Sequence, residues 1–145
     1  FLYGLLRPAD RIRNYRLEGH VRLPEEEDRT LFAYWRARLT DTFISAIRQQ
    51  GGILVNLASA EMKNLFDWTR VTREVRVITP DFYTYKGGRL STVVVYAKMC
   101  RGEMTRFILK NRIENPEDLK TFEWEGYRFN PRESHDDHWV FTPET

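Results

Sequence analysis

Apolar side chains along the chain recur with a helical period in one region and form short extended runs in others. Between residues 31 and 47 they recur every four positions, which predicts a helix that stops before the glycines at 51 and 52. The stripe consists of Leu31, Trp35, Leu39, Phe43 and Ile47. An acidic turn precedes this helix, and we expect Asp28 to cap its first turn.

Shorter segments follow this helix. Residues 53–57 are apolar except for Asn56 and predict a short buried strand, and Ser59 is placed to cap a helix that continues to about residue 67. Residues 74–79 and 90–97 then predict the two arms of a β-hairpin.

The glycines at 87 and 88 mark the turn of this hairpin, because glycine readily adopts the positive φ that tight turns require. Residues 93–96 are mostly β-branched and favour a central strand. A helix is expected over residues 98–113, with Gly102 as its weak point.

The C-terminal part predicts a helix capped by Asn115, then two short strands at 127–129 and 139–141. Helices and strands are interleaved without a repeat or an obvious linker. We therefore expect an α+β fold in which residues 1–145 form a single compact domain. Packed helices would cover a mixed or antiparallel sheet that contains β-hairpins.

Charges are concentrated in the opening segment. Residues 1–8 are largely apolar and predict a strand that runs into a turn at Pro8. Charged residues are interspersed here and in the residues that follow, and Arg7, Asp10, Arg16 and Glu18 are the candidates for a site. Arginine makes planar, bidentate contacts with phosphate or carboxylate, so the segment fits either a phosphate site or a structural ion pair.

The helix predicted over residues 98–113 carries a basic face. At about 100° per residue, four side chains fall within an arc of roughly 60°. They are Lys98, Arg101, Thr105 and Arg112, whereas Cys100, Met104, Phe107 and Ile108 share the arc expected to face the core. Gly102 lies beside the basic arc and would let a phosphate approach the backbone. The alternative is an ordinary solvated stripe.

Other candidate residues carry weaker signals. Asn56 ends a predicted strand, where a buried amide needs hydrogen-bond partners. His135 and His138 have a loose spacing that we do not assign to a metal, and we expect no cofactor. Cys100 is expected to be a small buried apolar residue rather than a redox sensor.

Composition narrows the function classes. The 145 residues are 41% hydrophobic and 30% charged, with a net charge of +2, which suits a globular protein. No apolar run approaches a membrane span, and the one cysteine fits a reducing compartment, so we expect a cytoplasmic protein without a secretory leader. Residues 7–22 and 98–112 are basic and residues 114–145 are acidic, a distribution suited to a polyanionic partner.

Several motifs resemble the YaaA family of bacterial peroxide-stress proteins. They are Leu-Tyr-Gly-Leu-Leu-Arg-Pro at 2–8, Asn-Leu-Ala-Ser at 56–59, Tyr-Ala-Lys at 96–98 and Gly-Tyr at 126–127. Lys98, Arg101, Gly102 and Arg106 coincide with a motif of that family. The resemblance implies that this chain corresponds to the C-terminal half, or a little more, of a family member.

The same resemblance implies a protein that limits iron-driven oxidative damage and binds DNA through a positively charged cleft. We expect contacts with double-stranded or branched DNA that do not depend on sequence, because phosphate contacts carry no base information. If the family's helix-hairpin-helix element lies in the N-terminal region of family members, DNA binding by this chain is expected to be weaker. An enzyme acting on a nucleotide or another phosphorylated small molecule is the alternative, and a fold without a ligand of its own is a third. Oligomeric state is left open.

Overall fold

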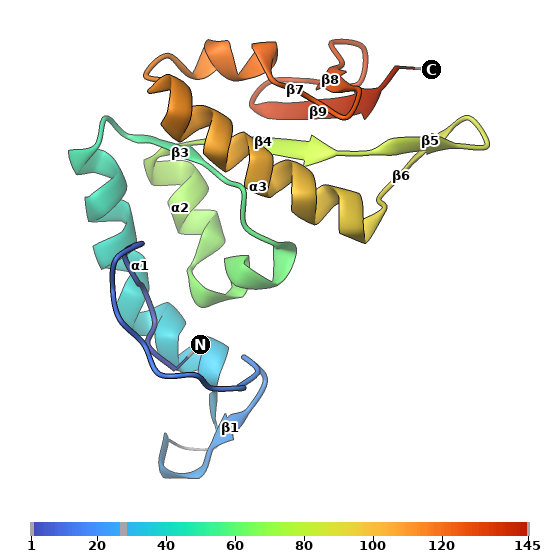
Figure 1. The fold of residues 1–145 in the computed structure, drawn as a ribbon. Coiled ribbons are helices and arrows are strands. Elements are labelled where there is room, and N and C mark those ends of the chain that lie inside the picture. The colour runs from blue at the N-terminus through green and yellow to red at the C-terminus, as the bar shows by residue number, and fades with distance from the viewer. Residues whose placement is uncertain (1, 27–28, 145) are drawn as a thin grey trace. The chain divides into compact units, whose positions relative to one another are not determined.

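A computed structural model describes residues 2–26 and 29–144 (Figure 1). Helices and strands are interleaved as expected, and the α+β class is confirmed. Contacts between Cα atoms group the chain into two compact units, which are described separately. Unit 1 comprises Phe1–Leu54 and Ala58–Val77, and unit 2 comprises Val55–Leu57 and Ile78–Thr145. The expectation that residues 1–145 form a single domain stays a prediction.

Unit 1 is built mainly from helices. Its elements are β1 (Arg22–Leu23), the 3-10 helix η1 (Pro24–Glu26), β2 (Arg29–Thr30), α1 (Leu31–Gln49), the 3-10 helix η2 (Ala60–Leu65) and α2 (Trp68–Glu74). Strands β1 and β2 pair in antiparallel fashion. Thr30 caps α1, because its hydroxyl accepts the Ala33 N–H at 3.2 Å. The expected cap, Asp28, lies outside the described residues.

The core of unit 1 lies along the apolar face of α1. The buried members are Phe32, Ile44, Ile47, Leu65, Phe66, Val71 and Val75, and Trp35, Leu39 and Phe43 of the predicted stripe pack against them. Leu31, the first residue of the stripe, is also buried. Phe43 and Phe66 stack with ring centroids 4.1 Å apart. The helical period predicted for this segment is therefore confirmed.

The strand predicted for residues 1–8 is wrong for the described part of that segment. Residues 2–21 contain no strand, and Leu2, Leu5 and Leu6 are exposed. Gly4 has a φ of +66°, and an added Cβ would meet the Trp35 ring at 3.1 Å. This positive φ bends the backbone out of the extended conformation that a strand requires.

Two further expectations in unit 1 need correction. Ser59 precedes η2, but its side chain makes no capping hydrogen bond. The helical segment it starts is 3-10 and ends at Leu65, and a separate helix, α2, follows. Asp67 caps α2 by accepting the Arg70 N–H at 3.0 Å. Helix α2 was not predicted, because only one of its residues, Val71, is buried and no apolar period marks it.

A five-stranded mixed sheet lies mostly in unit 2, although its residues 53–54 and 76–77 are grouped with unit 1. A mixed sheet was predicted from the sequence, but not the number or the order of its strands. Its strand order is β3 (Ile53–Val55), β4 (Arg76–Phe82), β9 (His138–Pro143), β8 (Tyr127–Phe129) and β7 (Glu123–Trp124). Strands β4 and β9 are parallel, whereas β9, β8 and β7 are antiparallel neighbours. The predicted strand at 53–57 is confirmed for its first part, although Ile53 is 37% exposed rather than buried.

The hairpin exists, but its arms differ from the prediction. Strand β5 (Thr84–Lys86) pairs with β6 (Arg89–Ser91), and Gly87 and Gly88 have φ values of 58° and 75°, as the turn requires. The segment predicted at 74–79 is instead β4, which pairs with β9.

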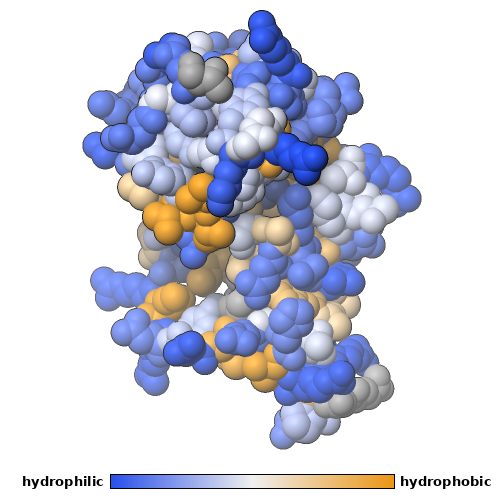
Figure 2. Space-filling model, turned by 90° about the vertical axis from the view of Figure 1, so that its right-hand side faces the viewer, coloured by the Kyte–Doolittle hydropathy of each residue, from blue (hydrophilic) through white to orange (hydrophobic). Residues whose placement is uncertain are grey.

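Residues 93–96 are not a strand. Helix α3 (Val94–Asn111) begins within them, so the predicted helix is confirmed but starts four residues earlier. Val94 and Val95 are 62% and 65% exposed, which shows that they do not occupy a central strand. Figure 2 views the molecule from the side where α3 begins and shows hydrophobic side chains (orange) at the surface among hydrophilic ones.

The core of unit 2 lies between α3, the 3-10 helix η3 (Pro116–Thr121) and the sheet. From α3 it receives Ala97, Cys100 and Met104, each at most 3% exposed. The sheet contributes Ile78, Phe82, Trp139 and Phe141, and η3 and its end contribute Leu119 and Phe122. This packing fixes which face of α3 reaches solvent. Within residues 2–26 and 29–144, no helix is long and apolar enough to cross a bilayer.

Candidate functional site

From residue 98 to residue 110, the exposed face of α3 carries a basic side chain at every fourth position except 102. Lys98, Arg106 and Lys110 are exposed, and Gly102 occupies the position between the first two. Residues four apart lie above one another on a helix, so these four form a continuous row. We call Lys98, Gly102, Arg106 and Lys110 the basic column. It faces solvent because the opposite face of α3 buries Ala97, Cys100 and Met104.

Arg101 and Thr105 lie on α3 beside the basic column. The Thr105 hydroxyl donates to the Arg101 carbonyl at 2.9 Å, and the Arg101 side chain is half-buried. Arg112, which the predicted arc includes, is the C-terminal cap and has a left-handed φ of 50°. Arg112 is therefore not in helical conformation, and the predicted arc holds only for Lys98, Arg101 and Thr105.

Gly102 has no structural partner that explains a glycine. It lies inside α3 with a φ outside the left-handed region, and an added Cβ would meet nothing within 4 Å. Glycine inside a helix costs roughly 0.5–1 kcal/mol relative to alanine. The fold would accommodate a side chain here, so the bare backbone is a feature of the surface rather than of the packing.

The basic side chains of this face are not engaged in ion pairs with the described carboxylates. In the part of the chain that the structure describes, Lys98, Arg101 and Arg106 form no ion pair within 4.0 Å. Uncompensated cations around an open stretch of backbone favour an anionic ligand.

The charged residues of the opening segment belong to unit 1. Arg7 and Asp10 come together: Asp10 Oδ1 lies 3.0 Å from Arg7 Nη2, and Oδ2 accepts the Arg7 backbone N–H at 2.8 Å. This backbone hydrogen bond, followed by the side-chain bond, lowers the pKa of Asp10. Arg16 and Glu18 are both exposed. Arg7 and Asp10 thus form an ion pair, but it lies in a turn with the Arg7 side chain 88% exposed, and it is not the buried pair at a strand end that was one interpretation of the sequence.

Asn56 follows β3 directly and is 6% exposed. Its backbone N–H donates to the Ile78 carbonyl at 2.8 Å, so this part of the residue continues the pairing of β3 with β4. Asn56 belongs to unit 2, as do the residues of the basic column.

One polar cluster in unit 2 was not predicted. His138 Nε2 lies 2.9 Å from Asp81 Oδ2, and the Tyr83 hydroxyl lies 3.4 Å from the same oxygen. Burial, and then the charge of Asp81, raise the pKa of Tyr83. His135 and His138 have ring centroids 5.0 Å apart. No sequence signal joins Asp81 to His138, because 57 positions separate them and the parallel pairing of β4 with β9 brings them together.

Cys100 lies in the core and is 0% exposed. Burial raises the pKa of its thiol to about 12. Because the thiolate is the form that reacts with oxidants, a thiol held protonated at neutral pH is a poor peroxide sensor. This agrees with the expectation of a small buried apolar residue.

Comparisons with known proteins identify the family of this chain. A family model described as "Peroxide stress protein YaaA" matches residues 1–133. A UPF0246 protein of Phocaeicola vulgatus is 63% identical over 142 residues, which are 98% of this chain and 56% of that protein. A UPF0246 protein of Hahella chejuensis is 41% identical over 142 residues, 97% of this chain and 55% of that protein. The chain spans little more than half the length of these curated relatives. It belongs to the peroxide stress protein YaaA family.

Proposed function

We propose that this chain binds DNA through phosphate contacts along the basic column, as part of a response to peroxide stress. The name of the family supports the second part of the proposal. The observation that carries the first part is the arrangement on α3, where Lys98 and Arg106 flank the bare backbone of Gly102.

The chemistry of this arrangement suits a phosphodiester. A phosphate over Gly102 would approach the helix closely, because no side chain occupies that position. Lys98 would meet it from the preceding turn as a compact point charge, and Arg106 from the following turn with a planar guanidinium. Lys110 extends the row by another turn and would serve a neighbouring phosphate.

Binding of this kind is independent of base sequence and strongly dependent on salt. Lysine and arginine that neutralise phosphates release condensed counterions, so affinity falls steeply as salt concentration rises. Phosphate contacts position a protein without reading bases, so double-stranded and branched DNA would both be bound. The resemblance to the family extends the proposal to a cytoplasmic protein that limits iron-driven damage to DNA.

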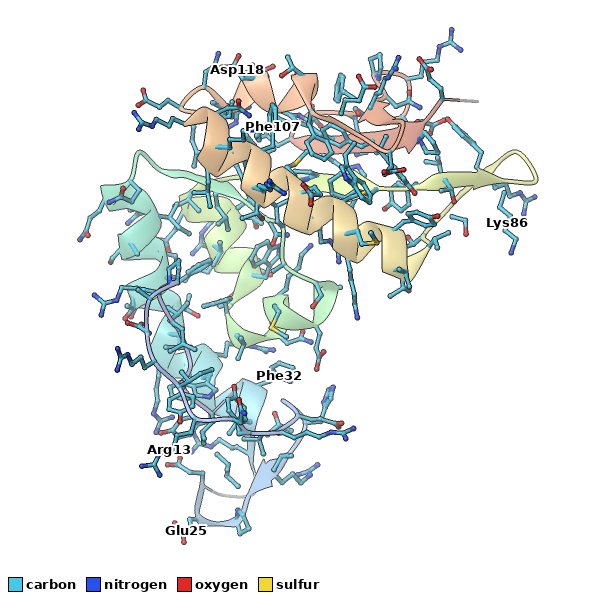
Figure 3. The ribbon with its side chains drawn as sticks, viewed as in Figure 1. Arg13, Glu25, Phe32, Lys86, Phe107 and Asp118 are labelled. Carbon is cyan, nitrogen blue, oxygen red and sulfur yellow. The ribbon has the colours of Figure 1, made fainter. Side chains whose placement is uncertain are left out.

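Fluorescence anisotropy of a labelled duplex, titrated with the chain over a series of salt concentrations, tests the proposal. The Lys98→Ala and Arg106→Ala substitutions should each weaken binding and should lower the slope of log K against log salt by about 1. Lys86→Ala is the matched control, because Lys86 is an exposed lysine on the β5–β6 hairpin (Figure 3) and lies outside the basic column. It should leave the slope nearly unchanged.

Two results would overturn the proposal. One is the absence of duplex binding by the wild-type chain at low salt. The other is equal loss of affinity in all three variants, which would show that net charge rather than the basic column governs binding.

A further inference from the structure

A groove lies beside the basic column in unit 2 and shares two residues with it. Its volume is about 240 Å³, and the C-terminal half of α3 forms one wall with Arg106, Phe107 and Lys110. Phe122 and Trp124, at and beyond the end of η3, line it as well. Figure 3 shows Phe107 on the part of α3 that lies next to η3. Asp118 is the residue labelled on η3.

Aromatic rings line this groove. Phe122 is buried, while Phe107 and Trp124 are half-buried. The Phe107 and Phe122 rings meet edge to face, with centroids 5.7 Å apart, which fixes their orientation. Half-buried aromatic rings in a groove provide faces on which a flat ring can stack.

Two cations and two carboxylates line the groove, and one of the carboxylates is already paired. Arg106 and Lys110 contribute two positive charges, and Glu103 and Glu123 contribute two carboxylates. The Glu123 carboxylate is engaged elsewhere, because it accepts a hydrogen bond from Arg128 at 3.0 Å. The cations that belong to the basic column are therefore opposed mainly by Glu103.

From these features we infer that the groove holds an unpaired nucleobase of a DNA strand whose phosphates lie on the basic column. The inference rests on the proposed function and adds a second contact to it. A strand that follows Arg106 and Lys110 would bring a base to the groove wall that these residues form. The groove is smaller than the roughly 300 Å³ at which pockets for drug-sized ligands begin, so it suits one ring system. A paired base inside a duplex could not enter it.

The test compares two labelled strands of about 12 residues at equal charge, one of thymidines and one of abasic deoxyribose units. The wild-type chain should bind the thymidine strand at least about fivefold more tightly, because stacking on an aromatic side chain supplies that much affinity for each base. Trp124→Ala should abolish the difference and should leave binding of the abasic strand unchanged. Trp124→Phe, which keeps a ring, should retain most of the difference.

A second readout does not depend on the folding of the alanine variant. Thymidine binding should quench tryptophan fluorescence in the wild-type chain, and the quenching should be lost in Trp124→Phe although three other tryptophans remain among the four. Titrations with duplex DNA, run alongside, test phosphate contact along the basic column separately from base stacking in the groove.

Each outcome decides between them. Equal, salt-sensitive binding of thymidine and abasic strands would overturn the groove and leave the basic column standing. A thymidine preference that Trp124→Ala does not change would also overturn the groove. Thymidine monophosphate binding as tightly as the strand would show that the occupant is a free nucleotide and would overturn the assignment to a strand. Absence of binding to any DNA at low salt would overturn both proposals.

Discussion

Asp10 binds Arg7 through both the backbone and the side chain of the arginine. Its Oδ2 accepts the Arg7 backbone N–H at 2.8 Å, and its Oδ1 accepts the guanidinium Nε and Nη2 at 3.2 and 3.0 Å. The Asp10 backbone N–H in turn donates to the Arg7 carbonyl at 3.0 Å. The pair therefore closes the turn that contains Pro8, and the Arg7 guanidinium is engaged within the segment.

This geometry predicts the titration of Asp10. Its pKa should lie below the ordinary value of 3.8, mainly because of the Arg7 backbone N–H and then because of the guanidinium. A lowered pKa in the folded state means a contribution to stability that is present above pH 3.8 and is lost as pH falls through the folded pKa.

Carboxyl chemical shifts followed by NMR across this range would measure the pKa of Asp10 directly. In Arg7→Ala the pKa should rise but stay below 3.8, because the backbone hydrogen bond remains. A wild-type value at or above 3.8 would contradict the turn as described.

The buried thiol of Cys100 should give the free energy of unfolding a different dependence on pH. Its thiol pKa is raised from 9.0 to about 12, so between these values the folded chain keeps a proton that the unfolded chain has lost. The free energy of unfolding should therefore fall as pH rises above about 9. Between pH 8 and pH 10 the free energy of unfolding should fall by about 1.4 kcal/mol more in the wild-type chain than in Cys100→Ala, which has no thiol to titrate.

Urea unfolding of both proteins at the two pH values would measure this difference, in which other titrating groups cancel. The folded wild-type chain should also react slowly with a thiol reagent and rapidly once unfolded. Fast reaction of the folded chain at neutral pH would contradict the buried, protonated thiol.

Thr40 joins two helices of unit 1 through one hydroxyl. It donates to the Arg36 carbonyl at 2.7 Å within α1 and accepts the backbone N–H of Asp67, the cap of α2, at 2.9 Å. Thr40→Val should lower the free energy of unfolding by about 1–3 kcal/mol, because it leaves the Asp67 N–H without its partner.

Thr72→Val is the matched control for this substitution. The Thr72 hydroxyl is exposed and bonds only to carbonyls of its own helix, at Trp68 and Thr69. Its replacement should change stability by less than about 0.5 kcal/mol. Equal effects of the two substitutions in denaturant titrations would show that the bond to Asp67 contributes nothing.

Local patterns in the sequence predicted the elements whose apolar residues repeat within one segment. The stripe of α1, the glycine turn between β5 and β6 and the core face of α3 depend on neighbouring residues only. The start of α3 was missed for the same reason. Val94 and Val95 favour a strand by local propensity, yet they are exposed on a helix whose burial of Ala97, Cys100 and Met104 outweighs that preference.

The candidate site was predictable to the extent that it lies on one helix. The row of Lys98, Gly102 and Arg106 follows from helical spacing once the buried face is known. The contact of His138 with Asp81 and the groove formed by Phe107 with Trp124 depend on pairings between distant segments. No pattern in the sequence encodes these pairings, because they arise from how the sheet is ordered.

Gly102 provides the most direct test of the basic column. Gly102→Ala should raise the free energy of unfolding by roughly 0.5–1 kcal/mol, because helix propensity improves and an added Cβ meets nothing within 4 Å. Gly102→Leu should also be at least as stable as the wild-type chain, since its side chain would extend into solvent. Both side chains would cover the backbone between Lys98 and Arg106.

The decisive measurement is the affinity of these two variants for duplex DNA at low salt, set beside their stability in denaturant. Affinity should decrease from glycine to alanine to leucine while stability does not decrease, so that misfolding cannot explain the loss. Leucine at position 102 with wild-type affinity would show that no phosphate approaches this part of α3, and it would contradict the account.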